Sequence, residues 1–237
     1  MQYIQKNPEP PELTQWRETQ LDLGINFTYK YDFQNPEKAI TRQSLLDEQG
    51  WICCYCCKRI SKETSHIEHF DPQSGSDPIL TVTYSNMLAS CGPLEREPAD
   101  KTKSVKWPKH CGHQRGREHE HEDEDGHEKI PENAALPIGP HLDPDCESYF
   151  TYTSNGEIKA AEGHPRSEDA TTVIKILSLN DPEVVEGRKR VLQALQGLTP
   201  ADAQILWERS QKKDSNGQFR TFCPVALDYL RKYFHLP

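Results

Sequence analysis

Residues 51–70, WICCYCCKRISKETSHIEHF, hold four cysteines and a His-x-Glu-His group, and this stretch decides which fold we expect. Two overlapping Cys-x-x-Cys pairs are available, Cys53 with Cys56 and Cys54 with Cys57. Such a pair places two thiolates around one tetrahedral zinc ion, and a single ion accepts only one of the two pairs. The stretch therefore predicts one half of a structural zinc knuckle, in either register.

The other half of the knuckle must come from elsewhere among the eight cysteines. In a reducing compartment, cysteines are more often metal ligands or inert thiols than disulfides. Cys91 and Cys111 lie near the other motifs, so we expect them to complete the site. Cys146 and Cys223 stand in segments that are typical of core packing.

Length and composition favour one large domain, or a small core with helical additions, in a chain of 237 residues. Only 34% of the residues are apolar, and no run approaches the ~20 apolar residues of a membrane span. The N-terminal stretch MQYIQKNPEPPEL lacks the apolar region of a secretory signal. We therefore expect a cytoplasmic protein with no membrane partner.

Charge argues against a stand-alone nucleic-acid binder, because the formal net charge is −9. Much of it lies in residues 118–128, EHEHEDEDGHE, which we expect to form a solvated acidic loop over 118–130. The rest of the chain is close to neutral. A basic groove must therefore be local, or a partner must supply it.

The segments on both sides of the cysteine and histidine motifs are predicted to be mainly helical. Helices are expected near 12–20, over 36–50, near 168–179, over 181–197, from 199 onward and near 224–234, with a hairpin at Asn155-Gly156. SHIEHFDP (65–72) predicts a short strand, and YSNMLASC (84–91) predicts a turn that leads into a short helix.

A second group of residues indicates hydrolytic chemistry: His66, Glu68 and His69, with Asn86 and His113 downstream. A carboxylate beside a histidine suits phosphodiester hydrolysis, because the carboxylate can hold a divalent ion while the imidazole takes a proton from water. His-x-Glu-His is a weak motif alone. Its position between the two halves of the knuckle strengthens it.

In the order Cys-x-x-Cys, Glu-His, Asn, Cys and CGHQRG, the sequence resembles the HNH endonucleases. The phrases EQGWICCYCCKRIS, SHIEHFDPQS, YSNMLASC, SYFTYTSNGEI and TVIKILSLNDPEVVEGRKRVL further resemble the PtuB proteins of Septu-type and retron-associated anti-phage systems. The resemblance spans roughly residues 1 to 200. It implies an α+β fold with a ββα-metal core and zinc knuckle, embedded in mainly α-helical flanking segments.

Four segments follow from the resemblance. These are a partner-docking segment (1–35), the HNH core with its knuckle (36–117), the acidic loop (118–130) and a hairpin with a C-terminal helical region (131–237). The resemblance also implies that Cys53, Cys56, Cys91 and Cys111 bind the structural zinc. The register of Cys53 with Cys56 is favoured because Lys58 and Arg59 then match the family's basic pair.

For catalysis, the resemblance implies that Glu68 binds Mg²⁺ or Mn²⁺, that His69 is the general base and that Asn86 orients the His69 imidazole. The last residue of the HNH motif would be the second ligand of that ion. We assign it to His113, with His110 as the alternative. Many relatives carry this ligand directly after the cysteine, where this chain has Gly112. Four cations are candidates to contact phosphates, although a solvated surface position fits each better: Lys58, Arg59, Lys62 and Arg115.

The partners implied by the resemblance are a PtuA-like ATPase, a nucleic-acid substrate and, in retron versions, a reverse transcriptase with its msDNA. The function expected is a metal-dependent endonuclease effector of anti-phage defence. Two alternatives stay open from the sequence: a nuclease of the same fold that cleaves RNA such as tRNA, and a zinc adaptor without catalytic activity.

Overall fold

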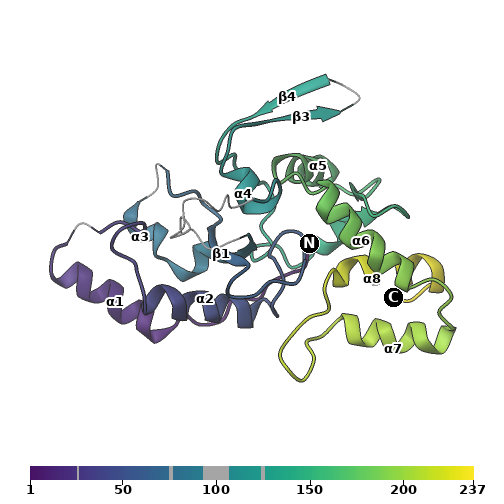
Figure 1. Cartoon of the computed structure of the whole chain (residues 1–237), viewed down its shortest axis with the longest axis horizontal. Coiled ribbons are helices and arrows are strands. Elements are labelled where there is room, and N and C mark those ends of the chain that lie inside the picture. The colour runs from purple at the N-terminus through teal and green to yellow at the C-terminus, as the bar shows by residue number, and fades with distance from the viewer. Residues whose placement is uncertain (26, 75–76, 93–106, 124–125) are drawn as a thin grey trace, which may run out of the picture.

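The computed structural model describes residues 1–25, 27–74, 77–92, 107–123 and 126–237 (Figure 1). Its helices are α1 (Pro11–Asp22), α2 (Glu37–Glu48), α3 (Pro78–Thr81), η1 (Tyr84–Asn86), α4 (Cys111–Arg115), η2 (Cys146–Tyr149), α5 (Ser167–Ile176), α6 (Pro182–Ala194), α7 (Pro200–Ser210) and α8 (Cys223–Phe234). Its strands are β1 (Ser65–His69), β2 (Met87–Cys91), β3 (His119–Asp123), β4 (Gly126–Ile130), β5 (Phe150–Tyr152) and β6 (Ile158–Ala160). Two-stranded sheets thus alternate with helices, as the α+β class predicts.

The central sheet pairs β1 with β2 in antiparallel register, with Ser65 opposite Cys91 and His69 opposite Met87. Every residue of both strands is buried. The prediction of a short helix within 84–91 is therefore wrong, because only η1 is helical and a strand follows it. Pairing with β1 determines this outcome, and Gln49 reinforces it by exchanging two side-chain hydrogen bonds with the backbone of Ala89.

The short helix α4 follows the strand pair and packs against β2. It begins at Cys111, whose φ of 57° turns the chain sharply into the helix. The amide of Cys111 donates to the carbonyl of Leu177, which ties α4 to the segment after α5. Residues 93–106, most of the excursion between Cys91 and Cys111, lie outside the described residues.

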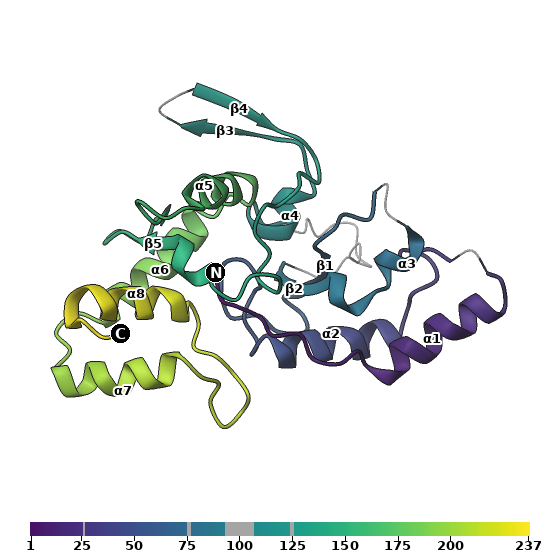
Figure 2. The ribbon, with the colours of Figure 1, turned by 180° about the vertical axis from the view of Figure 1, so that it is seen from behind.

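The acidic segment forms a hairpin, so the prediction of a loop over 118–130 is wrong. β3 and β4 pair with His119 opposite Ile130 and Asp123 opposite Gly126. The acidic composition argued for solvation, but backbone pairing does not depend on the polarity of the side chains. The hairpin projects from the body of the molecule in both views (Figures 1 and 2).

Helices α1 and α2 lie on the side of the molecule that carries β1 and β2, and α7 and α8 lie on the opposite side (Figure 2). The N-terminal segment contributes Met1, Ile4 and Leu13 to the main core, and whether it also docks a partner stays a prediction. The helix starts expected at 181 and 199 are confirmed, and the side chains of Asp181 and Thr199 accept backbone hydrogen bonds there, at the starts of α6 and α7. None of the described helices is both long and apolar enough to cross a bilayer.

Candidate metal and nuclease site

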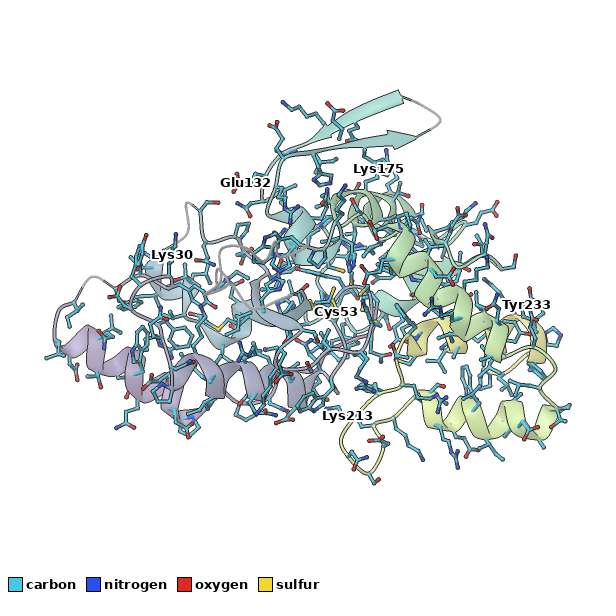
Figure 3. The ribbon with its side chains drawn as sticks, in the orientation of Figure 1. Lys30, Cys53, Glu132, Lys175, Lys213 and Tyr233 are labelled. Atoms are coloured by element: carbon cyan, nitrogen blue, oxygen red, sulfur yellow. The ribbon has the colours of Figure 1, made fainter. Side chains whose placement is uncertain are left out.

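Four cysteine sulfurs converge at the centre of the molecule, where Figure 3 labels Cys53. Cys53 and Cys56 lie on the turn closed by the bridge between Ile52 and Arg59. Cys91 ends β2 and Cys111 begins α4. The four sulfurs all lie within 4.8 Å of one another and are buried.

This arrangement selects one of the two registers that the sequence leaves open. Cys57 instead packs with Ile52 and Cys223 in a separate small cluster. Cys146 and Cys223 are both buried, as expected for core residues. The structure therefore brings together the four cysteines that the resemblance implies.

The donor chemistry of this cluster fits a zinc ion. Burial raises the pKa of the Cys111 thiol well above its usual value, and the neighbouring sulfurs raise it further. A bound divalent cation reverses this preference, because it stabilises the thiolates that it coordinates. Four buried sulfurs with tetrahedral ligand chemistry match a closed structural zinc site.

A cleft of about 610 Å³ lies beside the cysteine cluster, between β1 and α4. Because side chains alternate along a strand, His66 and Glu68 share one face of β1. Nε2 of His66 lies 3.4 Å from Oε2 of Glu68, and the ring of His113 on α4 lies 4.1 Å from the His66 ring, centroid to centroid. The Glu68 carboxylate thus lies beside the imidazoles of His66 and His113 in the cleft.

Two further side chains hold the Glu68 carboxylate. The Tyr55 hydroxyl donates to Oε1 over 3.1 Å, and Nη1 of Arg115 lies 3.4 Å from the same oxygen. Burial raises the pKa of the Glu68 carboxyl, but the hydrogen bond and charge of His66, with Arg115 and Tyr55, outweigh burial and lower it. Glu68 is therefore an ionised, oriented carboxylate.

Arg115 does not occupy the solvated surface position that the sequence favours. Its guanidinium is buried and donates to the backbone carbonyls of His69, Phe70 and Ala134. These hydrogen bonds fix the end of β1 and the chain that follows. Arg115 therefore supports the cleft from inside and is not placed to clamp phosphates.

His69 also lines the cleft, and its tautomer is set by its neighbours. Nε2 lies 2.7 Å from the carbonyl oxygen of Thr81, which can only accept, so Nε2 carries the proton. Nδ1 then holds a lone pair, which accepts a hydrogen bond from Nε2 of Gln73 over 3.0 Å. A neutral His69 can thus take up a proton at Nδ1.

Asn86 does not orient the His69 ring, contrary to what the resemblance implies. Its Oδ1 accepts from the amide of Asp71 over 2.7 Å, and its Nδ2 donates to the carbonyls of Asp71 and Leu80. Asn86 therefore braces the loop that leaves β1. Thr81 and Gln73 hold the ring instead, and neither residue was assigned a role from the sequence.

The two histidines that flank Cys111 occupy different places. Nδ1 of His110 lies 3.2 Å from the sulfur of Cys111 and 3.5 Å from that of Cys91, at the cysteine cluster. His113 lines the cleft. The structure thus places His113 among the cleft residues, and its role as a metal ligand stays a prediction.

Two glycines provide space that the sequence analysis did not foresee. A Cβ on Gly112 would lie 2.2 Å from Oε2 of Glu68 and 2.9 Å from Nε2 of His66. A Cβ on Gly92 would lie 2.1 Å from the His113 ring. The absence of a side chain at 112, where many relatives carry a ligand, therefore lets the Glu68 carboxylate and the His66 imidazole approach the start of α4 closely.

Comparison with known proteins identifies a relative of similar length, although no family model matches the chain. The chain is 29% identical over 222 residues to a protein of Vibrio cholerae serotype O1 biovar El Tor, described as "Retron Vc95 putative HNH endonuclease". The alignment covers 92% of this chain and 95% of the relative. The similarity to this relative extends over almost the full length of both proteins and supports endonuclease activity.

Proposed function

We propose that the chain is a metal-dependent HNH endonuclease effector of a retron or Septu-type anti-phage system, acting in the cytoplasm. In this proposal β1, β2 and α4 form the ββα-metal core, and a PtuA-like ATPase activates it. The observation that carries the proposal is the cleft itself. An ionised Glu68 lies there beside the imidazoles of His66 and His113, together with a His69 whose acceptor nitrogen is Nδ1.

His66, Glu68 and His113 are the residues that would hold the catalytic ion. A divalent ion in such a site stabilises negative charge on the phosphate and on the leaving oxygen. His69 removes the proton from the attacking water at Nδ1, and the Thr81 carbonyl stabilises the imidazolium that results. Gln73 must release Nδ1 before water can reach it.

The donor set favours Mn²⁺ over Mg²⁺ among the two ions that the resemblance implies. Imidazole nitrogens suit transition metals, whereas Mg²⁺ prefers an all-oxygen shell. His66, which the sequence reasoning grouped with Glu68 but left without a role, adds the second nitrogen. We expect faster cleavage with Mn²⁺ than with Mg²⁺ at equal concentrations.

Substitution of His69 by alanine, made in the operon with its neighbouring genes, tests the proposal. We expect the rate of cleavage to fall about 10² to 10⁴-fold if His69 is the general base. DNA and RNA are recovered from infected cells, and products confined to wild type identify the substrate. The matched control is His235→Ala, since His235 is exposed at the C-terminal end.

The outcomes separate the alternatives. Cleaved tRNA with intact DNA would support the RNA-directed nuclease. Protection that survives His69→Ala would place the chemistry in another subunit and leave this chain as a zinc adaptor. A reverse transcriptase with msDNA is a further proposed partner, tested by co-purification with the wild-type chain.

A further inference from the structure

A second cavity of about 460 Å³ adjoins the nuclease cleft and is not used by the chemistry above. The loop before α2, the first turns of α2 and β1 supply its walls. His66, Ile67 and Gln73 line both this cavity and the cleft. A ligand that reaches from the reacting phosphate past Gln73 would therefore enter the second cavity.

The walls of this cavity are basic, although the chain as a whole is acidic. Lys30, Lys38 and Arg42 line it, and the described lining residues include neither aspartate nor glutamate. Lys38 and Arg42 are four residues apart on α2, so they lie on the same face of the helix. Positive charge concentrated beside the cleft suits an anionic ligand.

Two tyrosines complete the cavity, and they differ in exposure. Tyr29 is 3% exposed, its ring lies 4.5 Å from the His69 ring in an edge-on arrangement, and the Lys38 ammonium lies 4.3 Å from its centroid. Tyr31 is 72% exposed, with the Lys30 ammonium 5.3 Å from its ring. Tyr31 thus offers an aromatic face to solvent within a basic cavity.

The loop that presents Tyr31 is held in place locally. The Asp32 carboxylate accepts hydrogen bonds from the amide and hydroxyl of Thr28, and the Asp32 amide donates to the Thr28 carbonyl. An exposed large aromatic side chain on a constrained loop provides a ready surface for stacking. Proteins that bind single-stranded nucleic acid combine such aromatic surfaces with basic grooves.

We propose that the second cavity binds an unpaired nucleotide next to the phosphate that is cut. Tyr31 stacks on its base, while Lys38 and Arg42 contact its phosphate. This inference rests on the proposed nuclease function for the neighbouring phosphate, but the binding it describes does not require cleavage. It makes the substrate single-stranded, or unpaired at the cleavage site, because a base within a duplex cannot lie on Tyr31.

Binding of fluorescent 12-nucleotide probes to the full chain tests this proposal, at low salt and without added divalent ions. The probes are single-stranded DNA, single-stranded RNA and a blunt duplex of each. We expect Tyr31→Ala to raise the Kd for a single-stranded probe by roughly 5- to 150-fold, which is the range for loss of one stacked base. Tyr31→Phe retains the ring and should stay close to wild type.

The matched control is Tyr233→Ala, because Tyr233 is 61% exposed and lies at the opposite end of the molecule from Lys30 (Figure 3). It should leave the Kd unchanged. Lys38→Gln should weaken binding and reduce the dependence of the Kd on salt, since a phosphate contact releases a counterion. The DNA and RNA probes then show which nucleic acid the cavity prefers.

An unchanged Kd in Tyr31→Ala, equal weakening for single strands and duplexes, or failure of the wild-type chain to bind any probe would overturn this inference. Cleavage measured separately distinguishes it from the proposed function. Tyr31-dependent binding without cleavage retains the nucleotide site and rejects the nuclease. Cleavage that is indifferent to Tyr31→Ala retains the nuclease and rejects the site.

Discussion

At the scale of single residues, Gly112 is a position where one added methyl group has a predictable effect on the cleft. Alanine there would place its Cβ 2.2 Å from Oε2 of Glu68, so the carboxylate would have to move. We expect Gly112→Ala to weaken Mn²⁺ binding at the cleft about 10- to 100-fold, as loss of ligand orientation does elsewhere. Calorimetric titration with Mn²⁺ measures this.

The control for Gly112→Ala is Gly116→Ala at the opposite end of the same helix, α4. A Cβ at 116 would meet its nearest backbone atom at an ordinary 3.5 Å, and the φ of Gly116 is −70°. Gly116→Ala should keep wild-type affinity and fold. Equal Mn²⁺ affinity in both variants would reject the role assigned to Gly112.

A second residue-scale prediction concerns His141, whose ring lies 5.0 Å from the ring of Phe70. Burial, with the charge of Lys6, lowers the pKa of His141 from 6.5 to about 4. Between these two pH values the unfolded chain binds a proton at His141 and the folded protein does not. The contribution of neutral His141 to the free energy of unfolding is therefore complete above pH 6.5 and is lost as the pH falls toward 4.

His141→Gln removes this titration. Allowing for the partial exposure of His141, we expect wild type to lose about 1 kcal/mol more than the variant in free energy of unfolding between pH 7.5 and pH 5. Urea unfolding of both proteins at the two pH values measures the difference. Identical losses in the two proteins would show that His141 titrates normally.

At the scale of elements, the strand pair depends on Arg115 of α4. Its guanidinium satisfies two backbone carbonyls at the end of β1 and that of Ala134 after β4, and it approaches Glu68. Arg115→Gln leaves these buried carbonyl oxygens without their hydrogen-bond donor. We expect it to lower the free energy of unfolding by about 2–4 kcal/mol. Arg190→Gln on the exposed face of α6 should change stability by less than about 0.5 kcal/mol.

Chemical denaturation of the two arginine variants checks this prediction. A similar small effect of both substitutions on the free energy of unfolding would mean that water replaces the Arg115 hydrogen bonds without loss.

Residues 84–91 are the element where the predicted short helix is wrong. Its strand exists because β1 lies alongside, and such pairing between segments distant in sequence leaves no local signature.

At the scale of the whole molecule, the cysteine cluster joins the turn after α2, the end of β2 and the start of α4. We expect about one zinc per chain, and loss of zinc in Cys53→Ser because that sulfur belongs to the set. Cys54→Ser is the matched control, since Cys54 is buried beside Cys53 but lies outside the set. Metal analysis of the purified proteins measures the zinc content.

The stability of the folded protein should depend on bound zinc. Chelation of the wild-type protein is expected to lower its Tm, because binding to the folded state alone adds directly to the free energy of unfolding. Cys54→Ser should respond to the chelator as wild type does. Retention of zinc by Cys53→Ser, with loss in Cys54→Ser, would reverse the register.

The sequence by itself predicted the approximate bounds of most helices and the two groups of candidate residues, and its resemblance to the HNH endonucleases implied the α+β class and the zinc ligands. The helix bounds and candidate groups depend on local chemistry: helix starts such as Asp181-Pro182, the Asn155-Gly156 turn, and the spacing of cysteines and histidines. Such signals act over a few residues and can be read directly from the chain.

Tertiary structure alone decided which Cys-x-x-Cys pair converges with Cys91 and Cys111, which histidine enters the cleft, and what holds His69. It also decided that Glu68 and His66 pack against Gly112 and that Tyr31 lines the second cavity. Each of these facts is a distance between segments far apart in the chain. Packing of the whole core sets such distances, and no local sequence pattern contains them.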